Sequence, residues 1–282
     1  MEDNKNCYYL KKINFEKGIL DNIVDCCIVL LLETNLDRKK SIMVTLNKYR
    51  ICKNIIIQYN KGYKNCEKKL YKKNSLHDLN DSYYNAFKYA NKQNFKNILI
   101  LEDDVLFDYN IKNPKIIKDI QNLYNNIDVD IFSLGTCVRL VHPINIILDT
   151  FNCKKLIFLS STHACIYNKN FRDIFMKKYE NNRTIGFDED LNVKNYNIYT
   201  YNKPIAYQPF VVTENSKEWA MFGINFSNFS RSYMKLFNLD FENNAIYSFK
   251  KLEKSVFLIN IIIYVFAIFI IYKVINLYLK TK

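Results

Sequence analysis

The stretch Asn97–Asp104 reads NILILEDD, an almost wholly apolar run that ends in three consecutive acids. A continuous apolar run of this length is typical of a strand that is covered on both faces of a sheet. Three carboxylates would be costly inside a core, so we expect them beyond the carboxyl end of the strand, where open α/β sheets bind ligands. The stretch therefore predicts a central strand and a site at its end.

Strand-like and helix-like patterns alternate on both sides of this stretch. The further strand-like segments are residues 26–33, 54–58, 128–134 and 164–167. The helix-like segments are residues 36–50 and 78–91, and one more that begins at Pro114. This alternation predicts an α/β domain with a mixed, mostly parallel sheet flanked by helices. We expect the domain to occupy residues 21–245, after an N-terminal extension of residues 1–20.

The C-terminal region carries the longest apolar segment of the chain. Residues 256–272 read VFLINIIIYVFAIFIIY, without a charge, and lysines lie on both sides of the segment. With Lys273 and the following VINLYL, it is long enough to cross the hydrocarbon core of a bilayer. It is apolar all round, which argues against a core helix with one buried face. We expect residues 255–279 to form a single transmembrane helix that anchors the protein in a membrane.

Charge and cysteine usage narrow the class of protein. The net charge is +13, but the basic residues are dispersed in pairs, so a dedicated nucleic-acid-binding surface is excluded. The eight cysteines include no CxxC pair, which argues against a zinc site. The polar N-terminal segment lacks the apolar core of a signal peptide. We therefore expect free thiols in a reducing compartment and a catalytic domain that faces the cytoplasm.

The three acids suggest a metal site. Side chains alternate along a strand, so Glu102 and Asp104 point to one side and Asp103 points to the other. Two carboxylates on one side suit Mg²⁺ or Mn²⁺, which would bridge the pyrophosphate of a sugar nucleotide. The alternative is a solvated strand end with helix-capping acids. His163, just before an apolar segment, is either a third metal ligand or a hydrogen-bonded structural histidine.

The segment ILILEDDVLFD resembles the strand and metal motif of glycosyltransferase family 25, which includes bacterial lipopolysaccharide and collagen galactosyl- and glucosyltransferases. Four further segments are similar to motifs of that family, namely residues 35–38, 161–175, 186–191 and 203–210. The helix before the metal strand lacks a clean match to the Ser-His pair that the family often has. The resemblance implies a GT-A (Rossmann-like) fold, a UDP-sugar donor and a glycan, lipid or protein hydroxyl as acceptor.

Roles for individual residues follow from the same resemblance. Asp188 is the preferred general base, with Asp190 second, because sugar transfer needs a carboxylate to remove the proton of the acceptor hydroxyl. The alternative for both is capping at the start of a helix. Arg38 and Asp103 are the candidates for contact with the nucleotide, Arg38 by neutralising a phosphate. The alternative for Arg38 is a surface position at the start of a helix.

The sequence thus predicts a membrane-anchored glycosyltransferase that uses Mn²⁺ or Mg²⁺ and a nucleotide-sugar donor. Two alternatives stay open. One is another two-carboxylate enzyme, such as a glycoside hydrolase or a phosphoryl-transfer enzyme, although no Gly-rich phosphate loop is present. The other is a catalytically degenerate transferase domain that serves as a membrane-tethered binding or scaffold protein.

Overall fold

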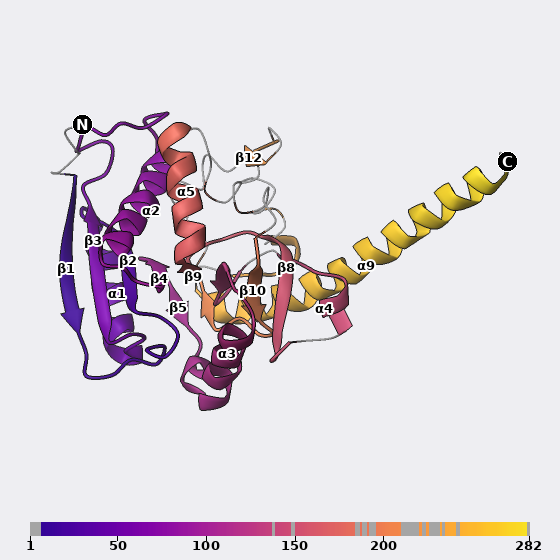
Figure 1. The fold of residues 1–282 in the computed structure, drawn as a ribbon, viewed down its shortest axis with the longest axis horizontal. Helices are drawn as coiled ribbons and strands as arrows, with labels where there is room; N and C mark the ends of the chain where they lie inside the picture. Colours follow the sequence, from indigo (N-terminus) through magenta and orange to yellow (C-terminus); the bar gives the residue numbers. More distant parts are fainter. Residues whose placement is uncertain are drawn as a thin grey trace.

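The computed structural model describes residues 7–136, 139–147, 150–183, 196–209 and 243–280, and short pieces at 187, 191, 220–221, 224–225, 232 and 235–240. Within them, a nine-stranded sheet lies between two layers of helices (Figure 1). Its strand order is β1 (Tyr8–Asn14), β3 (Asn54–Asn60), β2 (Cys26–Leu32), β4 (Asn97–Glu102), β9 (Ala164–Asn168), β6 (Ile131–Ser133), β10 (Ile198–Tyr201), β8 (Cys153–Leu159) and β7 (Arg139–Val141).

The helices divide between the two faces of the sheet. One core contains residues of α1 (Leu36–Tyr49) and α3 (Pro114–Asn126), and the other contains residues of α2 (Ser75–Lys92) and α5 (Lys169–Asn181). The remaining elements are β5 (Leu106–Phe107), η1 (Tyr109–Lys112), α4 (Ile144–Ile147), β11 (Ala206–Tyr207), β12 (Ala220–Met221), β13 (Ile224–Asn225) and α9 (Ala245–Lys280).

The predicted fold class, a mixed α/β sheet flanked by helices, is confirmed. Strands β3, β2 and β4 are parallel and form the core of the sheet. Antiparallel strands extend it on both sides, with β1 next to β3 and β9 next to β4. Each strand and helix expected from the patterns is present, with boundaries that differ by a few residues.

Strand β4 shows why the central segment is a continuous apolar run. Leu99 and Leu101 face the core that includes α1 and α3, whereas Ile98 and Ile100 face the core that includes α2 and α5. All four side chains are fully buried. A strand in contact with helices on both faces has no solvent side, so the alternation of polar and apolar residues disappears. The three acids begin at the end of β4, where helices no longer cover both faces of the strand.

Asparagine is the N-terminal cap of four helices in this chain, which is poor in Gly and Pro. The side chains of Asn35, Asn74, Asn113 and Asn168 each accept a hydrogen bond from a backbone N–H in the first turn of α1, α2, α3 and α5. Such caps satisfy N–H groups that have no partner within the helix. The Asn35 cap receives the N–H of Arg38 and fixes the first turn of α1 next to the end of β2.

The N-terminal segment belongs to the sheet and is not a separate extension. β1 pairs with β3 along its whole length, from Tyr8 opposite Asn60 to Asn14 opposite Asn54. Leu20 is fully buried in the core. The domain therefore begins before residue 21. The pattern of β1 was missed because most of its side chains are exposed, as is usual for an edge strand.

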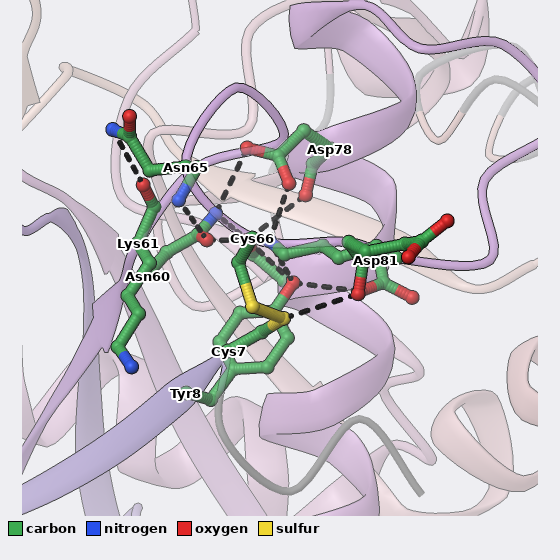
Figure 2. Close-up of a disulfide and its surroundings, with 12 residues drawn as sticks. Cys7, Tyr8, Asn60, Lys61, Asn65, Cys66, Asp78 and Asp81 are labelled. Atoms are coloured by element: carbon green, nitrogen blue, oxygen red, sulfur yellow. Dashed lines mark hydrogen bonds and ion pairs between the residues drawn. A yellow bond between two sulfur atoms is a disulfide. The ribbon is translucent and has the colours of Figure 1, made fainter.

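A disulfide joins the start of β1 to the loop after β3. Cys7 and Cys66 are bonded, with their Cα atoms 5.6 Å apart (Figure 2). The expectation of free thiols is therefore wrong for this pair, because two cysteines far apart in the chain meet only after β1 has paired with β3. Five other cysteines of the described residues are buried and form no disulfide, namely Cys26, Cys27, Cys52, Cys153 and Cys165.

Helix α9 is one continuous helix that begins on the domain and extends beyond it (Figure 1). It is long and apolar enough to cross a membrane, and only 11% of its most apolar stretch of 18 residues is buried. This agrees with the predicted C-terminal apolar helix. Its first half packs on the domain through Phe249, Leu252 and Val256, which share a small core with Tyr207.

Candidate functional site

The acidic triplet lies at the carboxyl end of the parallel core. Glu102 is the last residue of β4, and its backbone N–H donates to the carbonyl of His163 at the neighbouring strand end, at 2.9 Å. On the α2 side, the Tyr83 hydroxyl lies 3.1 Å from Glu102 Oε1. The same hydroxyl lies 3.2 Å from the carbonyl of Thr162. Glu102 is therefore held by contacts on its backbone and on its side chain.

Gln208 connects the two carboxylates that were expected to share one side. Its Nε2 lies 3.4 Å from Glu102 Oε2, and 3.2 Å and 3.1 Å from Asp104 Oδ1 and Oδ2. Gln208 reaches this place because β11 pairs with β5, directly after the acidic turn, with Tyr207 opposite Leu106. One N–H₂ group thus lies among three carboxylate oxygens. The predicted same-side arrangement of Glu102 and Asp104 is consistent with these contacts.

Arg38 also contacts Asp104. Its Nη1 forms an ion pair with Asp104 Oδ2 at 2.9 Å, and both side chains are largely buried. Burial raises the pKa of the Asp103 carboxyl, and the charge of Arg38 and the backbone of Leu32 oppose this rise. Asp103 therefore lies towards the end of β2, beside Arg38. The two residues predicted to contact the nucleotide lie together.

His163 is fully buried, and its ring lies against Phe249 of α9 with centroids 6.4 Å apart. Burial lowers the pKa of its imidazole to about 4, opposed by the backbone of Ala206. Neither ring nitrogen has a hydrogen-bond partner of normal geometry within the described residues. In the part of the chain that the structure describes, no group of three His, Cys, Asp or Glu side chains could hold a metal. His163 as a third metal ligand stays a prediction.

The predicted bases Asp188 and Asp190 lie outside the described residues. Phe187, which precedes Asp188 in the chain, is buried and stacks on the ring of Tyr83, with centroids 4.0 Å apart. Its backbone N–H donates to the side chain of Asn80 at 3.2 Å. The aromatic residue before the acidic segment therefore packs on the tyrosine that contacts Glu102.

A second polar cluster at the end of β3 was not recognised in the sequence. Lys68 is buried, forms an ion pair with Asp78 and donates to Asn60, the last residue of β3 (Figure 2). Burial lowers the pKa of Lys68, and Asp78 opposes this effect. Lys68 belongs to one of the dispersed pairs of basic residues, Lys68 and Lys69. No periodic pattern could have distinguished this lysine from its exposed neighbour Lys69.

Asp81 forms the other half of this cluster. Its carboxylate accepts from the hydroxyls of Tyr8 at 2.7 Å and Tyr179 at 3.2 Å, and Arg183 lies 3.8 Å away. Burial raises the pKa of Asp81, and these three partners and Lys68 lower it. The Cys7–Cys66 disulfide lies beside the cluster (Figure 2). The paired groups and the disulfide tie β1, the loop after β3 and α2 together.

No protein-family model and no curated protein matches the chain. Among solved structures, the chain is similar to A197 from STIV, with 11% identity and a TM-score of 0.40, over 67% of this chain and 86% of that one. It is also similar to a glycosyltransferase involved in the glycosylation of the major capsid of PBCV-1, with 9% identity and a TM-score of 0.38, over 67% of this chain and 94% of that one. Matches at this level carry no argument about donor, acceptor or mechanism, and membership of family 25 stays a prediction.

Proposed function

We propose that the protein is a metal-dependent glycosyltransferase of the GT-A type that transfers a sugar from a nucleotide donor, in the first place a UDP-sugar, to a hydroxyl acceptor. The observation that carries this proposal is the position of the Gln208 amide, which lies among three oxygens of Glu102 and Asp104 at the carboxyl end of the parallel strands. This is the crevice in which open α/β sheets bind ligands.

The two carboxylates fit a divalent cation that is completed by a substrate. Mg²⁺ and Mn²⁺ are commonly held by one or two carboxylates, with water and phosphate oxygens as the other ligands. Glu102 and Asp104 converge on one N–H₂ donor, and this contact with a positively polarised group supports a cation site at this point. A bound Mn²⁺ or Mg²⁺ would neutralise the charge of the departing diphosphate. The fit does not require His163 as a ligand.

The chain's own residues would bind the donor and take up the proton. Arg38, at the first turn of α1, is placed to exchange Asp104 for a phosphate oxygen, since guanidinium binds both groups through paired N–H donors. Asp103 lies beside Arg38 and would orient it. Asp188, with Asp190 second, would remove the proton of the acceptor hydroxyl as it attacks the anomeric carbon.

The membrane anchor and the orientation of the domain belong to the same proposal. Helix α9 would cross the bilayer once and hold the catalytic domain at its surface. The Cys7–Cys66 disulfide argues against the predicted cytoplasmic placement, because disulfides persist mainly in oxidising compartments. We therefore place the domain on an oxidising side of the membrane.

The test uses the full chain in detergent micelles or nanodiscs with a panel of nucleotide sugars, with and without Mn²⁺. The proposal predicts Mn²⁺-dependent release of one nucleoside diphosphate when an acceptor is supplied, and loss of release in Asp104→Asn. Cleavage of a glycoside without any nucleotide would favour the hydrolase. Absence of nucleotide and metal binding by a folded sample would favour the scaffold protein.

A further inference from the structure

The first half of α9 is fixed to the edge strand of the sheet. Among the residues that the structure describes, β7 is the last strand of the sheet, and α9 supplies partners for its backbone. The side chain of Asn260 accepts from the N–H of Val141 at 2.8 Å and donates to the carbonyl of Arg139 at 3.0 Å. The Tyr264 hydroxyl donates to the carbonyl of Val141 at 2.6 Å. The Arg139–Glu253 ion pair adds a contact at 2.5 Å, so the helix is held by the domain as far as residue 264.

The outer face of these docked turns is apolar and exposed. The side chains of this face are between 45% and 65% exposed, namely Phe257, Leu258, Ile259, Ile262 and Ile263. The exposed apolar surface then continues without interruption along Val265–Ile271 and beyond. A contiguous apolar patch of this size is rare on a protein surface in water and marks a surface that is covered by something else. Whatever covers this apolar surface must already cover the turns of α9 that are packed on the domain.

The length of α9 also indicates that the part covered by the membrane begins within the docked turns. The part beyond the last domain contact, residues 265–280, is about 24 Å long, shorter than the hydrocarbon core of about 30 Å. The part from Phe257 to Leu279 is about 34 Å long and would span that core with some tilt. A helix that crosses the bilayer therefore brings its docked turns to the boundary of the hydrocarbon core, and the strand bound to those turns comes with it to the headgroup layer.

We infer that the β7–β8 edge of the domain, with α4, rests in the headgroup layer of a bilayer rather than at a distance from it. Ile157 of β8 and Ile144 of α4 are 47% and 64% exposed. β8 approaches α9 through Lys154 and Phe257, and α4 packs on β8. The Lys154 ammonium of β8 lies 5.6 Å from the ring centroid of Phe257 of α9. Apolar side chains and cations at the same depth along the helix form the pattern that binds an anionic lipid surface.

The excess of basic residues supports lipid as the occupant. Lys250, Lys251 and Lys254 lie in the turns directly before the apolar face, where the phosphates of the headgroups would be. Each lysine near an anionic surface contributes attraction of about 1 kcal/mol. A second copy of the chain has the same positive charge at this level and would be repelled. The inference rests on the proposed membrane span of α9 and is independent of the sugar-transfer chemistry.

The test places single tryptophans in the full chain, with the native Trp219 replaced by Phe, in nanodiscs of anionic lipids brominated near the headgroup end of the acyl chains. Ile157→Trp reports the β8 surface, Ile144→Trp reports α4, and Ile270→Trp reports the helix. Tyr71→Trp, beside His77 at the start of α2, is the matched control, because it is exposed and on the other side of the domain.

We expect about a twofold loss of fluorescence at Ile157→Trp and Ile144→Trp, since side chains in the interface lie within about 10 Å of the acyl boundary. Ile270→Trp should also be quenched, and Tyr71→Trp should not. Quenching at Ile270→Trp alone would show that the domain stands away from the membrane and would overturn the inference. No quenching at Ile270→Trp would overturn the span as well. Equal emission at all positions with a dimeric particle would identify a second copy as the cover.

Discussion

At the scale of single residues, the site combines charges that hold one another in place. Asp104 forms an ion pair with Arg38 and accepts from the amide of Gln208, which also donates to Glu102 and so bridges the two carboxylates. Charged partners that have been removed from water interact more strongly than exposed ones. The arrangement is one that a cation and a phosphate could replace with little movement of the backbone, because β4, β11 and the capped start of α1 carry the side chains.

Replacement of Arg38 by Ala should weaken binding of a nucleoside diphosphate. A hydrogen bond to a charged group contributes about 1.5–3 kcal/mol, so we expect a dissociation constant raised by tenfold or more. Calorimetric titration with UDP and Mn²⁺ measures the effect. Lys40→Ala, on the same helix, is the matched control and should bind as the wild type does. Equal affinities for both variants would contradict the role of Arg38.

His163 gives the protein a pH dependence of known sign. Its pKa is 6.5 when exposed and about 4 in the folded protein. As the pH falls from about 6.5 to about 4, the unfolded chain binds a proton that the folded protein does not, so stability is lost. The loss should approach about 3 kcal/mol at the lower end. Urea unfolding at pH 7 and pH 4 should show a smaller loss for His163→Leu than for the wild type, and equal losses would contradict the assignment.

At the scale of elements, the patterns identify those parts whose burial is periodic or continuous. β2, β4 and the α helices on both faces follow from apolar runs and from helical spacing, because each has a well-defined buried side. β1 does not, since an edge strand shows most of its side chains to solvent. Gln208 could not be predicted, because β5 and β11 have two residues each and no pattern records their pairing. The same holds for the disulfide, which depends on the pairing of β1 with β3.

The disulfide should contribute strongly to stability. It closes a loop with a sequence separation of 59 residues. The chain-entropy model gives about 4 kcal/mol for a loop of this size. Cys66→Ser should lower the free energy of unfolding by a similar amount, and a reducing agent should do the same to the wild type. Cys153→Ser, at a buried cysteine outside the disulfide, controls for loss of packing. A wild type that is insensitive to reduction would show that the bond does not form or contributes nothing.

Asn260 should be the main polar link between α9 and the sheet. Asn260→Leu leaves the N–H of Val141 and the carbonyl of Arg139 buried without this partner. An unsatisfied buried group costs about 1–3 kcal/mol, so thermal unfolding in detergent should shift clearly to lower temperature. Ile259→Leu, on the exposed face of the same turn, should leave the transition unchanged. An equal effect of both substitutions would show that α9 is not docked through Asn260.

At the scale of the whole molecule, the candidate site and α9 are connected through neighbouring residues. α9 packs on Tyr207, and the next residue, Gln208, reaches the two carboxylates. Removing the helix would therefore expose Tyr207 and disturb the segment that carries Gln208, so activity should be measured on the full chain. The acids of residues 186–191 were recognised by resemblance, and of that segment Phe187 packs on Tyr83, the tyrosine that contacts Glu102.

The most direct test of the proposed site is the binding of UDP to the full chain with and without Mn²⁺. Wild type is compared with Asp104→Asn and with Asp173→Asn, a matched control at an exposed carboxylate of α5. The proposed site predicts Mn²⁺-dependent binding that Asp104→Asn abolishes and Asp173→Asn retains. Binding that is independent of Mn²⁺, or that survives Asp104→Asn in a folded protein, would contradict it.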